Sequence, residues 1–446
     1  MYRTEVSFGK KLGRLTLGAV QEPPKARSRP AANLPPVGGA DAPLPARVLL
    51  DDLRAKMDAI LSRAPVTRAP ATLDAPELPF VTEVTALGDL HRRVVRFPLS
   101  HRVGHKSVGP AHSADAELLA LLALDPSIAR ASPAGALYLD TETTGLAGGA
   151  GTVAFLVGLA FFDEGALVVE QLLVRALGEE APMLEHVRKR VLGASMLVSF
   201  NGKSFDMPLL RTRFVMARTT APPEPAHLDL VHVARRIHKR RGFPCRLVTI
   251  EERVLGFQRI DDVPSGEVSA CYLHFLRTGE TGALLGVIEH NLHDVVTMAA
   301  LVGLYGEPLA GSELVPDDLA GASRVLSRAG AKDAARAFAD RAIEEGGGAD
   351  ALRASAEIAK ARGDRARALK DFQAALERED DPKVRLELAK LYEHHERDLE
   401  RALELTLRGT SEAPEAESKR KRRLHAKLEA KSRRAEASAP LFARRK

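Results

Sequence analysis

The stretch Leu137-Tyr-Leu-Asp-Thr-Glu-Thr-Thr-Gly145 decides the fold of the central part of the chain. Its first three residues are apolar and predict a short buried strand. Asp140 and Glu142 follow at alternate positions, and alternate residues of an extended chain share one face. Two carboxylates on one face repel each other unless a cation or a proton lies between them. Because Mg²⁺ and Mn²⁺ prefer oxygen ligands, the pair is a candidate metal site. The alternative is a strand that simply ends in a polar turn.

Further strands are expected on the C-terminal side of this stretch. Two apolar, β-branched runs at residues 152–162 and 167–174 predict an antiparallel meander together with the opening strand. The Gly-rich run at residues 146–152 fits neither a Walker loop nor a dinucleotide fingerprint, and a strand follows it, so it is expected to form a turn. An amphipathic helix at residues 179–192 and a buried strand at residues 196–200 come next.

A second polar stretch, Phe200-Asn-Gly-Lys-Ser-Phe-Asp-Met-Pro-Leu-Leu210, leads from that strand into a helix. Asp206 lies in the first turn of this helix, while the apolar residues around it can anchor the helix to a core. Taken alone, Asp206 needs no further explanation, because the helix dipole stabilises an acid at this position.

A third stretch, Ile288 to Leu301, carries His290 and Asp294 on a helix with an apolar stripe. Residues four apart are neighbours on one helix face. An acid with a His one turn away, beside a metal, has the geometry of general acid–base chemistry. A surface His–Asp pair is the alternative.

The three stretches together supply four acids, each at a strand end or on an adjoining helix. One sheet can bring all four to one edge. Converging carboxylates would be strongly destabilising without a compensating divalent ion. Two such ions about 4 Å apart can clamp an in-line attack at phosphorus. The four acids are Asp140, Glu142, Asp206 and Asp294.

The motifs at residues 140–145, 201–206 and 290–294 (Asp-Thr-Glu-Thr-Thr-Gly, Asn-x-x-x-Phe-Asp and His-x-x-x-Asp) resemble those of the DEDD (DnaQ-like) 3′→5′ exonucleases. The sequence between them looks closest to the YprB-like ribonuclease-H-like family, over about residues 130–305. This resemblance implies an α/β ribonuclease-H-like fold, in which helices flank a mixed sheet of an antiparallel meander plus parallel strands.

The resemblance also implies the roles of individual residues. It implies that two Mg²⁺ or Mn²⁺ ions are held by the four acids, and that His290 is the candidate base that positions the attacking water. Candidates for contact with the substrate phosphate are Thr143, Asn201 and Lys203. Asp229 resembles a structural Asp of such folds and is not expected to be a ligand.

One position departs from the family pattern. DEDD enzymes usually carry His five residues before the last Asp, or Tyr four residues before it. Here Glu289 stands at the first position and His290 at the second. His293 is adjacent and is an alternative base. The resemblance therefore supports metal binding better than it supports the rate of hydrolysis.

The whole chain of 446 residues is long enough for roughly two to four domains. Its two cysteines, Cys245 and Cys271, argue against a disulfide framework and fit a reducing cytoplasm. The N-terminus lacks the apolar core of a signal peptide, and the longest apolar run is too short to span a bilayer. A cytoplasmic protein without membrane contact is expected, and its net charge of +6 favours a polyanionic partner.

Four regions are expected along the chain. They are a Pro-rich N-terminal arm with a short helix and candidate strands (1–109), a ribonuclease-H-like exonuclease domain (110–312), helical repeats (313–415) and a basic tail (416–446). Arg365-Ala-Arg-Ala-Leu369 recurs 34 residues later as Leu399-Glu-Arg-Ala-Leu403, a period that resembles tetratricopeptide (TPR) repeats. Such repeats imply a surface for a protein partner or the substrate; a helical cap on the catalytic domain is the alternative.

A basic cluster lies between the second and the third motif. Its members are Arg235, Arg236, Lys239, Arg240, Arg241 and Arg246. Contact with phosphates and a plain solvated surface are both open for these side chains.

The sequence thus predicts a divalent-metal-dependent nuclease, most consistent with a 3′→5′ exonuclease that acts on a single-stranded end of DNA or RNA. The alternative is a nucleic-acid-binding or scaffold protein with a weakened or inactive site, which binds partners through TPR-like repeats. The sequence does not decide whether the substrate is DNA or RNA, or whether cutting is exonucleolytic or endonucleolytic.

Overall fold

The computed structural model describes residues 77–145 and 151–437. The predicted Pro-rich arm, the helix expected near residues 49–64, most of the Gly-rich turn and the last residues of the basic tail lie outside the described residues.

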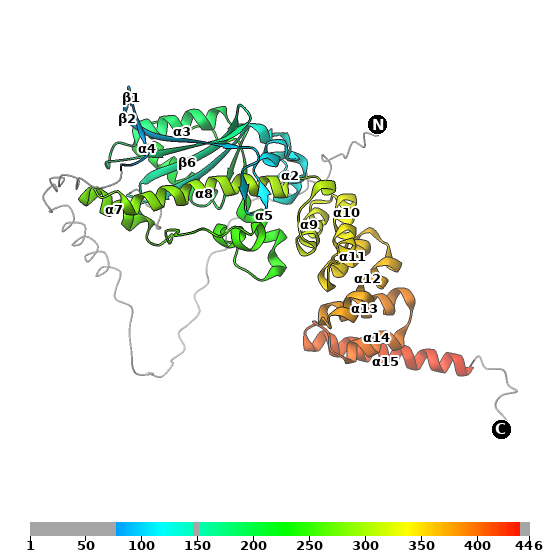
Figure 1. Cartoon of the computed structure of the whole chain (residues 1–446). Helices are drawn as coiled ribbons and strands as arrows, with labels where there is room; N and C mark the ends of the chain where they lie inside the picture. The colour runs from blue at the N-terminus through cyan, green and yellow to red at the C-terminus, as the bar shows by residue number, and fades with distance from the viewer. Residues whose placement is uncertain (1–76, 146–150, 438–446) are drawn as a thin grey trace, which may run out of the picture. The chain divides into compact units, whose positions relative to one another are not determined.

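One mixed sheet forms the centre of the N-terminal half (Figure 1). Its strand order is β1-β2-β7-β6-β5-β8-β9. The bounds are Val81–Thr85 (β1), Gly88–Pro98 (β2), Ala136–Thr143 (β5), Ala154–Asp163 (β6), Ala166–Leu173 (β7), Met196–Ser199 (β8) and Ala226–Asp229 (β9). β5, β6 and β7 pair antiparallel, whereas β8 is parallel to both β5 and β9. The predicted meander with added parallel strands, and hence the ribonuclease-H-like fold class, is confirmed.

The sheet begins before residue 110, where the sequence predicts the start of the domain. β2 pairs antiparallel with β7 over His91 to Pro98, and β1 pairs with β2. Arg92 connects these strands, because it forms ion pairs with Glu83 at 2.5 Å and with Glu170 at 2.7 Å. The two strands assigned to the N-terminal arm are therefore part of the central sheet. A separate small hairpin, Arg102–Val103 (β3) with Lys106–Ser107 (β4), follows them.

Helices cover both faces of the sheet (Figure 1). One face packs against α3 (Ala181–Gly193) and α4 (Asp206–Met216); the other packs against α2 (Ala116–Ala123), α5 (Leu230–Ile237) and α8 (Gly282–Tyr305). Alternation along β5 sends Leu137 and Leu139 into the first core and Tyr138 into the second. This alternation also decides which face each polar residue at the end of β5 occupies.

The C-terminal part is all helical, as predicted. Its helices are Pro316–Ala329 (α9), Lys332–Glu344 (α10), Ala349–Arg362 (α11), Arg365–Arg378 (α12), Pro382–Leu391 (α13), Leu399–Leu407 (α14) and Pro414–Ala437 (α15). Successive helices pack in pairs, and buried Ala side chains at their contacts allow a close approach. Asp364, Asp381 and Asp398 cap the N-termini of α12, α13 and α14.

The basic tail predicted from residue 416 begins as part of this helical region. Arg423 and Lys427 of α15 each form an ion pair of 2.8 Å with Glu393, and Arg420 forms a third at 3.1 Å. Glu393 is buried, so these pairs fix α15 to the preceding helices. Among the helices that the structure describes, none combines the length and the apolar content needed to cross a bilayer.

Candidate active site

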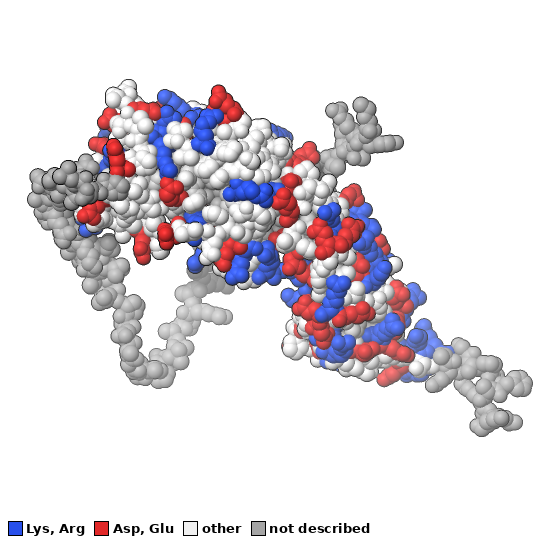
Figure 2. Space-filling view, viewed as in Figure 1, with Lys and Arg blue, Asp and Glu red and all other residues white. Residues whose placement is uncertain are grey.

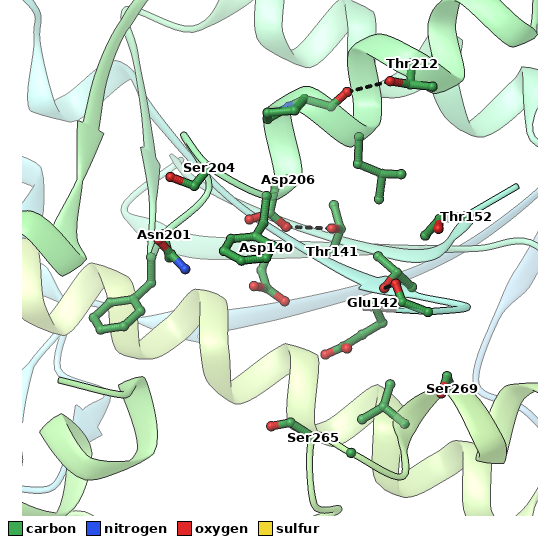
Figure 3. A pocket seen from close by; sticks show the side chains of 18 residues that line it. Asp140, Thr141, Glu142, Thr152, Asn201, Ser204, Asp206, Thr212, Ser265 and Ser269 are labelled. Carbon is green, nitrogen blue, oxygen red and sulfur yellow. Dashed lines mark hydrogen bonds between the residues drawn. The ribbon is translucent and has the colours of Figure 1, made fainter. Parts of the chain in front are cut away.

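The end of β5 places its two acids on the face that packs against α8. Asp140 and Glu142 point to this side, whereas Thr141 between them points to the α4 side. The hydroxyl of Thr141 donates a hydrogen bond of 2.5 Å to Oδ1 of Asp206, the first residue of α4 (Figure 3). A register shift in the pairing with β6 occurs between Glu142 and Thr143, where the strand leaves the sheet. β5 thus connects to polar groups on both faces.

The turn between β8 and α4 sets the position of Asp206. Asn201 adopts a left-handed backbone with φ of 72°, which Asn tolerates better than most residues. The buried carboxylate of Asp229 accepts hydrogen bonds from the backbone N–H of Asn201 at 2.7 Å and of Lys203 at 3.2 Å. A Cβ atom on Gly202 would lie 2.5 Å from Oγ of Ser199, so only glycine fits there. Asp229 is a structural residue, as the sequence predicts.

Helix α8 contributes three polar groups within five residues. Nδ2 of the fully buried Asn291 donates a hydrogen bond of 2.9 Å to Oδ2 of Asp140. Nε2 of His290 lies 4.0 Å from Oε1 of Glu142 and 3.7 Å from Oδ2 of Asp294. Helix α8 therefore brings the third sequence motif against the first.

Asp262, in the loop before α7 (Val268–Thr278), orients the imidazole of His290. Its Oδ1 lies 2.7 Å from Nδ1 of His290. Nη1 of Arg259, a donor, lies farther from the same nitrogen, at 3.2 Å. Because the carboxylate of Asp262 is an acceptor and makes the shorter contact, it favours the tautomer with the proton on Nδ1. Nε2 is then an acceptor that faces Glu142 and Asp294.

Arg259 is a buried cation at the edge of this cluster. Its side chain is 2% exposed and forms two hydrogen bonds of 2.7 Å with Glu251, which is fully buried. It also forms an ion pair with Asp294. Burial opposes the charged form of Arg259, but the negative charges of Asp294 and Glu251 raise its pKa above the ordinary value. One acid of the cluster therefore has a permanent counter-charge.

A cavity of about 500 Å³ opens beside these groups (Figure 3). Asp140, Glu142 and Asp206 line it, together with Thr143 and Asn201. Other polar lining residues are Thr141, Thr152, Ser204, Thr212, Ser265 and Ser269. The cavity is large enough for a nucleotide-sized ligand by comparison with ordinary ligand pockets of about 300–1,000 Å³.

The carboxyl groups in this cavity have raised pKa values. Burial, followed by the negative charges of Asp294 and Asp206, raises the pKa of both Asp140 and Glu142 well above the ordinary value. Burial also raises the pKa of Asp206 to about 6, although the hydrogen bond from Thr141 opposes the rise. Carboxyl groups in this state need a proton or a cation among them.

The donor set fits a divalent cation. One ligand atom each of Glu142, His290 and Asp294 can be chosen so that all three lie within 4.8 Å of one another. Asp140 and Asp206 add oxygen donors in the adjoining cavity. Carboxylate oxygens suit Mg²⁺ or Mn²⁺, and a cation would relieve the mutual repulsion that, with burial, raises the pKa of Asp140 and Glu142.

The candidates Lys203 and His293, and Glu289 beside the third motif, have partners outside the described cavity lining. Nζ of Lys203 lies 3.4 Å from Oδ2 of Asp125, and Lys203 is absent from the described cavity lining. Glu289, at the position where many DEDD enzymes carry His, forms an ion pair of 2.7 Å with Arg93. The ring of His293 packs at 5.5 Å against that of Phe257. Burial lowers the pKa of His293, so it is a neutral packing residue here.

Four residues that contact the predicted acids or His290 were not predicted from the sequence. Thr141 and Asn291 adjoin predicted residues, so strand alternation and the helical repeat could have indicated them. Asp262 and Arg259 lie in irregular segments before α7. No periodic pattern marks them, since their positions depend on how the chain returns to α8.

Comparison with known proteins gives first the class of this domain. Residues 137–305 match the family described as the RNase H superfamily, from the start of β5 to the end of α8. Together with the mixed sheet, this match supports a ribonuclease-H-like fold for the region.

One protein with a similar sequence is "Uncharacterized protein YprB" from Bacillus subtilis (strain 168). It is 36% identical over 216 residues, which cover 47% of this chain and 51% of the relative. The chain thus spans about half the length of the curated relative that it matches. The likeness supports a YprB-like, ribonuclease-H-like relationship for the aligned part.

Proposed function

We propose that the chain is a divalent-metal-dependent nuclease of the DEDD type, which removes nucleotides from the 3′ end of a single strand. The observation that carries this proposal is that the end of β5 meets two separate segments. It shares a polar cavity with the start of α4, and α8 contacts it through the Asn291–Asp140 hydrogen bond and the cluster of Glu142, His290 and Asp294. Their acidic side chains have too little compensating charge without a cation.

In this proposal the metal ligands are Asp140, Glu142, Asp206 and Asp294. Two bound divalent ions would supply a hydroxide nucleophile and stabilise the charge that develops at phosphorus. Asn291 holds the Asp140 carboxylate through its 2.9 Å hydrogen bond, and Thr141 holds Asp206 in the same way. These bonds fix two acids before the substrate enters.

His290 would accept a proton from the attacking water through Nε2. Asp262 at 2.7 Å fixes the ring and stabilises the imidazolium that forms. Thr143 and Asn201 line the cavity and remain candidates for contact with the substrate phosphate. Lys203 would have to leave Asp125 to reach it.

The test uses 5′-labelled single- and double-stranded DNA and RNA with Mg²⁺ or Mn²⁺. We expect stepwise shortening from the 3′ end, release of mononucleotides, and loss of both in Asp140→Ala and Asp206→Ala. Asp163→Ala is the matched control, because Asp163 is a half-exposed acid at the other end of the meander. If the purified wild type degrades no substrate with either metal, the proposal is wrong.

A second candidate is a nucleic-acid-binding scaffold with a weakened site. The ion pair of Arg259 with Asp294 favours it, since a permanent cation takes part of the charge that a metal would compensate. The position of His290, four residues before Asp294 where DEDD enzymes usually carry Tyr, also agrees with a weakened site. This candidate predicts salt-sensitive binding without turnover, unchanged by His290→Ala.

We further propose that α9 to α14 are TPR-like helix pairs. The starts of α11 and α13, at residues 349 and 382, and of α12 and α14, at residues 365 and 399, agree with a repeat of nearly constant length. Stacked pairs of this kind provide an extended surface for a partner or for the substrate.

A further inference from the structure

A second cavity, of about 650 Å³, lies where α5 meets α9. Its lining comes from the end of α5, the turn Lys239–Arg241, the segment that follows it, and one side of α9. It shares no lining residue with the carboxylate cavity. We call it the α5–α9 cleft.

The cleft is strongly basic. Six of its eleven described lining residues are Arg or Lys, and none of the eleven is acidic. The six are Arg235, Arg236, Lys239, Arg240, Arg324 and Arg328. Figure 2 shows Lys and Arg side chains on the surface below α5, next to the start of the helical region.

Intramolecular partners compensate only part of this charge. Arg240 and Arg324 share the carboxylate of Asp350. Among the described residues, the acceptors of Arg236 are backbone carbonyl groups, which carry no net charge. The remaining three cations are Arg235, Lys239 and Arg328. Within residues 77–145 and 151–437, no carboxylate forms an ion pair with any of them.

The cations of the cleft repel one another. Burial lowers the pKa of Arg236, and the positive charge of Arg328 lowers it further. Burial likewise lowers the pKa of Arg240, with a second contribution from Arg324. An anion in the cleft would relieve this repulsion, whereas a merely solvated basic surface would spread its charges apart.

The two walls of the cleft are held together rigidly. A Cβ atom on Gly321 of α9 would lie 2.0 Å from the carbonyl oxygen of Ile237, so glycine permits backbone contact between the walls. Beside it, buried His238 contacts Asp318 at 2.7 Å and the hydroxyl of Tyr305 at 2.9 Å. The basic side chains therefore project from two helices that are in direct backbone contact.

The spacing of the cations suits a phosphodiester backbone. Arg324 and Arg328 are one helical turn apart, about 6 Å along α9. The two guanidinium groups can therefore contact more than one phosphate of a strand. Phe243 also lines the cleft, and the guanidinium of Arg241 lies over its ring at 5.0 Å.

We propose that the α5–α9 cleft binds the phosphate backbone of a nucleic-acid strand, as a docking site apart from the carboxylate cavity. The inference rests on the proposed nuclease function, because it assigns the cleft to the same substrate. It would make long strands bind better than short ones, since only a long strand can occupy both sites.

The test measures binding and hydrolysis separately. Fluorescence anisotropy with a labelled single strand of about 20 nucleotides, longer than the ~4–16 that one such site covers, is recorded in EDTA. We expect Arg235→Ser/Arg328→Ser to weaken binding about fivefold or more. The slope of log K against log salt should fall by about 1.4, because each single-strand phosphate contact contributes about 0.7. The matched control is Lys332→Ser/Lys370→Ser, which removes two exposed charges of the helical region outside the cleft.

Hydrolysis of bis-p-nitrophenyl phosphate, which is too small to reach the cleft, should stay within about twofold of wild type in the same variant. Unchanged strand binding, or an equal loss in the control, overturns the inference. The inference is also overturned if AMP or pyrophosphate displaces the labelled strand as effectively as an unlabelled strand does, because the cleft would then bind a small phosphorylated ligand. If the wild type hydrolyses neither substrate, the proposed nuclease function is wrong. The anisotropy measurements then still decide whether the α5–α9 cleft binds a strand.

Discussion

The side-chain amide of Asn291 donates a hydrogen bond of 2.9 Å to Oδ2 of Asp140. Its carbonyl oxygen accepts one of 3.0 Å from Gln171, which also donates to the carbonyl oxygen of Ile288 at 2.7 Å. Both Asn291 and Gln171 are fully buried. Helix α8, β7 and the C-terminal end of β5 are therefore joined by one continuous network of hydrogen bonds within the core.

Asn291→Ala should weaken metal binding more than it weakens the fold. Asp140 would lose the donor that orients it, and partners that orient a ligand typically contribute about 10–100-fold in affinity or activity. We expect a decrease of that size in Mn²⁺ affinity, measured by isothermal titration calorimetry, and in turnover. Unchanged affinity and turnover would show that Asn291 only fills space in the core.

Gly158→Ala, on the neighbouring strand β6, should disturb the same hydrogen-bond network. A Cβ atom on Gly158 would lie 2.3 Å from Oδ1 of Asn291, so the amide must move. We expect a destabilisation of about 1–3 kcal/mol in urea unfolding, together with lower activity. Gly193→Ala at the end of α3 is the control, because no atom of the described residues lies within 4 Å of the position that its Cβ would take and alanine favours helix. Equal effects of the two substitutions would contradict this account.

The raised pKa of Asp206 predicts the pH dependence of the metal-free protein. Its folded-state pKa of about 6 exceeds the ordinary value of 3.8, so the native state holds this proton more tightly than the unfolded chain does. The corresponding stability is present at low pH and is lost as the pH rises from about 4 through about 6. Asp206→Asn should remove this loss.

The measurement is urea unfolding in EDTA at pH 5 and pH 8. Relative to wild type, Asp206→Asn should gain stability at the higher pH. Adding Mn²⁺ at pH 8 should stabilise wild type more than the variant, because a cation replaces the lost protons. A difference between the two proteins that does not change with pH would show that Asp206 does not titrate in this range.

Strand and helix periodicity explain what the sequence could predict about this site. Asp140 and Glu142 share a face because side chains of a strand alternate, and His290 meets Asp294 because four residues make about one helical turn. Those rules act within one element. The approach of Arg259 to Asp294 depends on the course of an irregular segment, for which the sequence offers no period.

Two expectations differ from the structure for related reasons. Lys203 follows Asn201 in a motif-like turn, but the hydrogen bonds of Asp229 to the turn backbone direct its side chain to Asp125. The sequence predicts candidate strands in the segment of β2 but places them in the N-terminal arm, whereas β2 pairs with β7 of the central sheet. Its Arg92 charge is satisfied by Glu170 of β7, a contact that becomes evident only once the strands are paired.

His290→Ala should lower kcat by about 10²–10⁴-fold, the usual contribution of a general base. Asp262→Asn should lower it less, because the ring is then held without a full negative charge. His293→Ala is the matched control, since His293 packs against Phe257 and forms no ion pair with a site carboxylate within the described residues. Equal kcat in wild type and His290→Ala would remove His290 from the mechanism but leave the metal site intact.

Arg259→Met should destabilise the fold by about 3–5 kcal/mol, because the fully buried Glu251 would lose both of its 2.7 Å hydrogen bonds to the guanidinium and remain as an unpaired charge. A second substitution, Glu251→Gln, should then recover much of the loss by removing that charge. The free energies of unfolding of the two single variants and the double variant give the coupling between the residues. Arg277→Met, at an exposed Arg of α7, should stay within about 0.5 kcal/mol of wild type. Additive effects of the two substitutions would mean that Arg259 stabilises the chain through Asp294 rather than through Glu251.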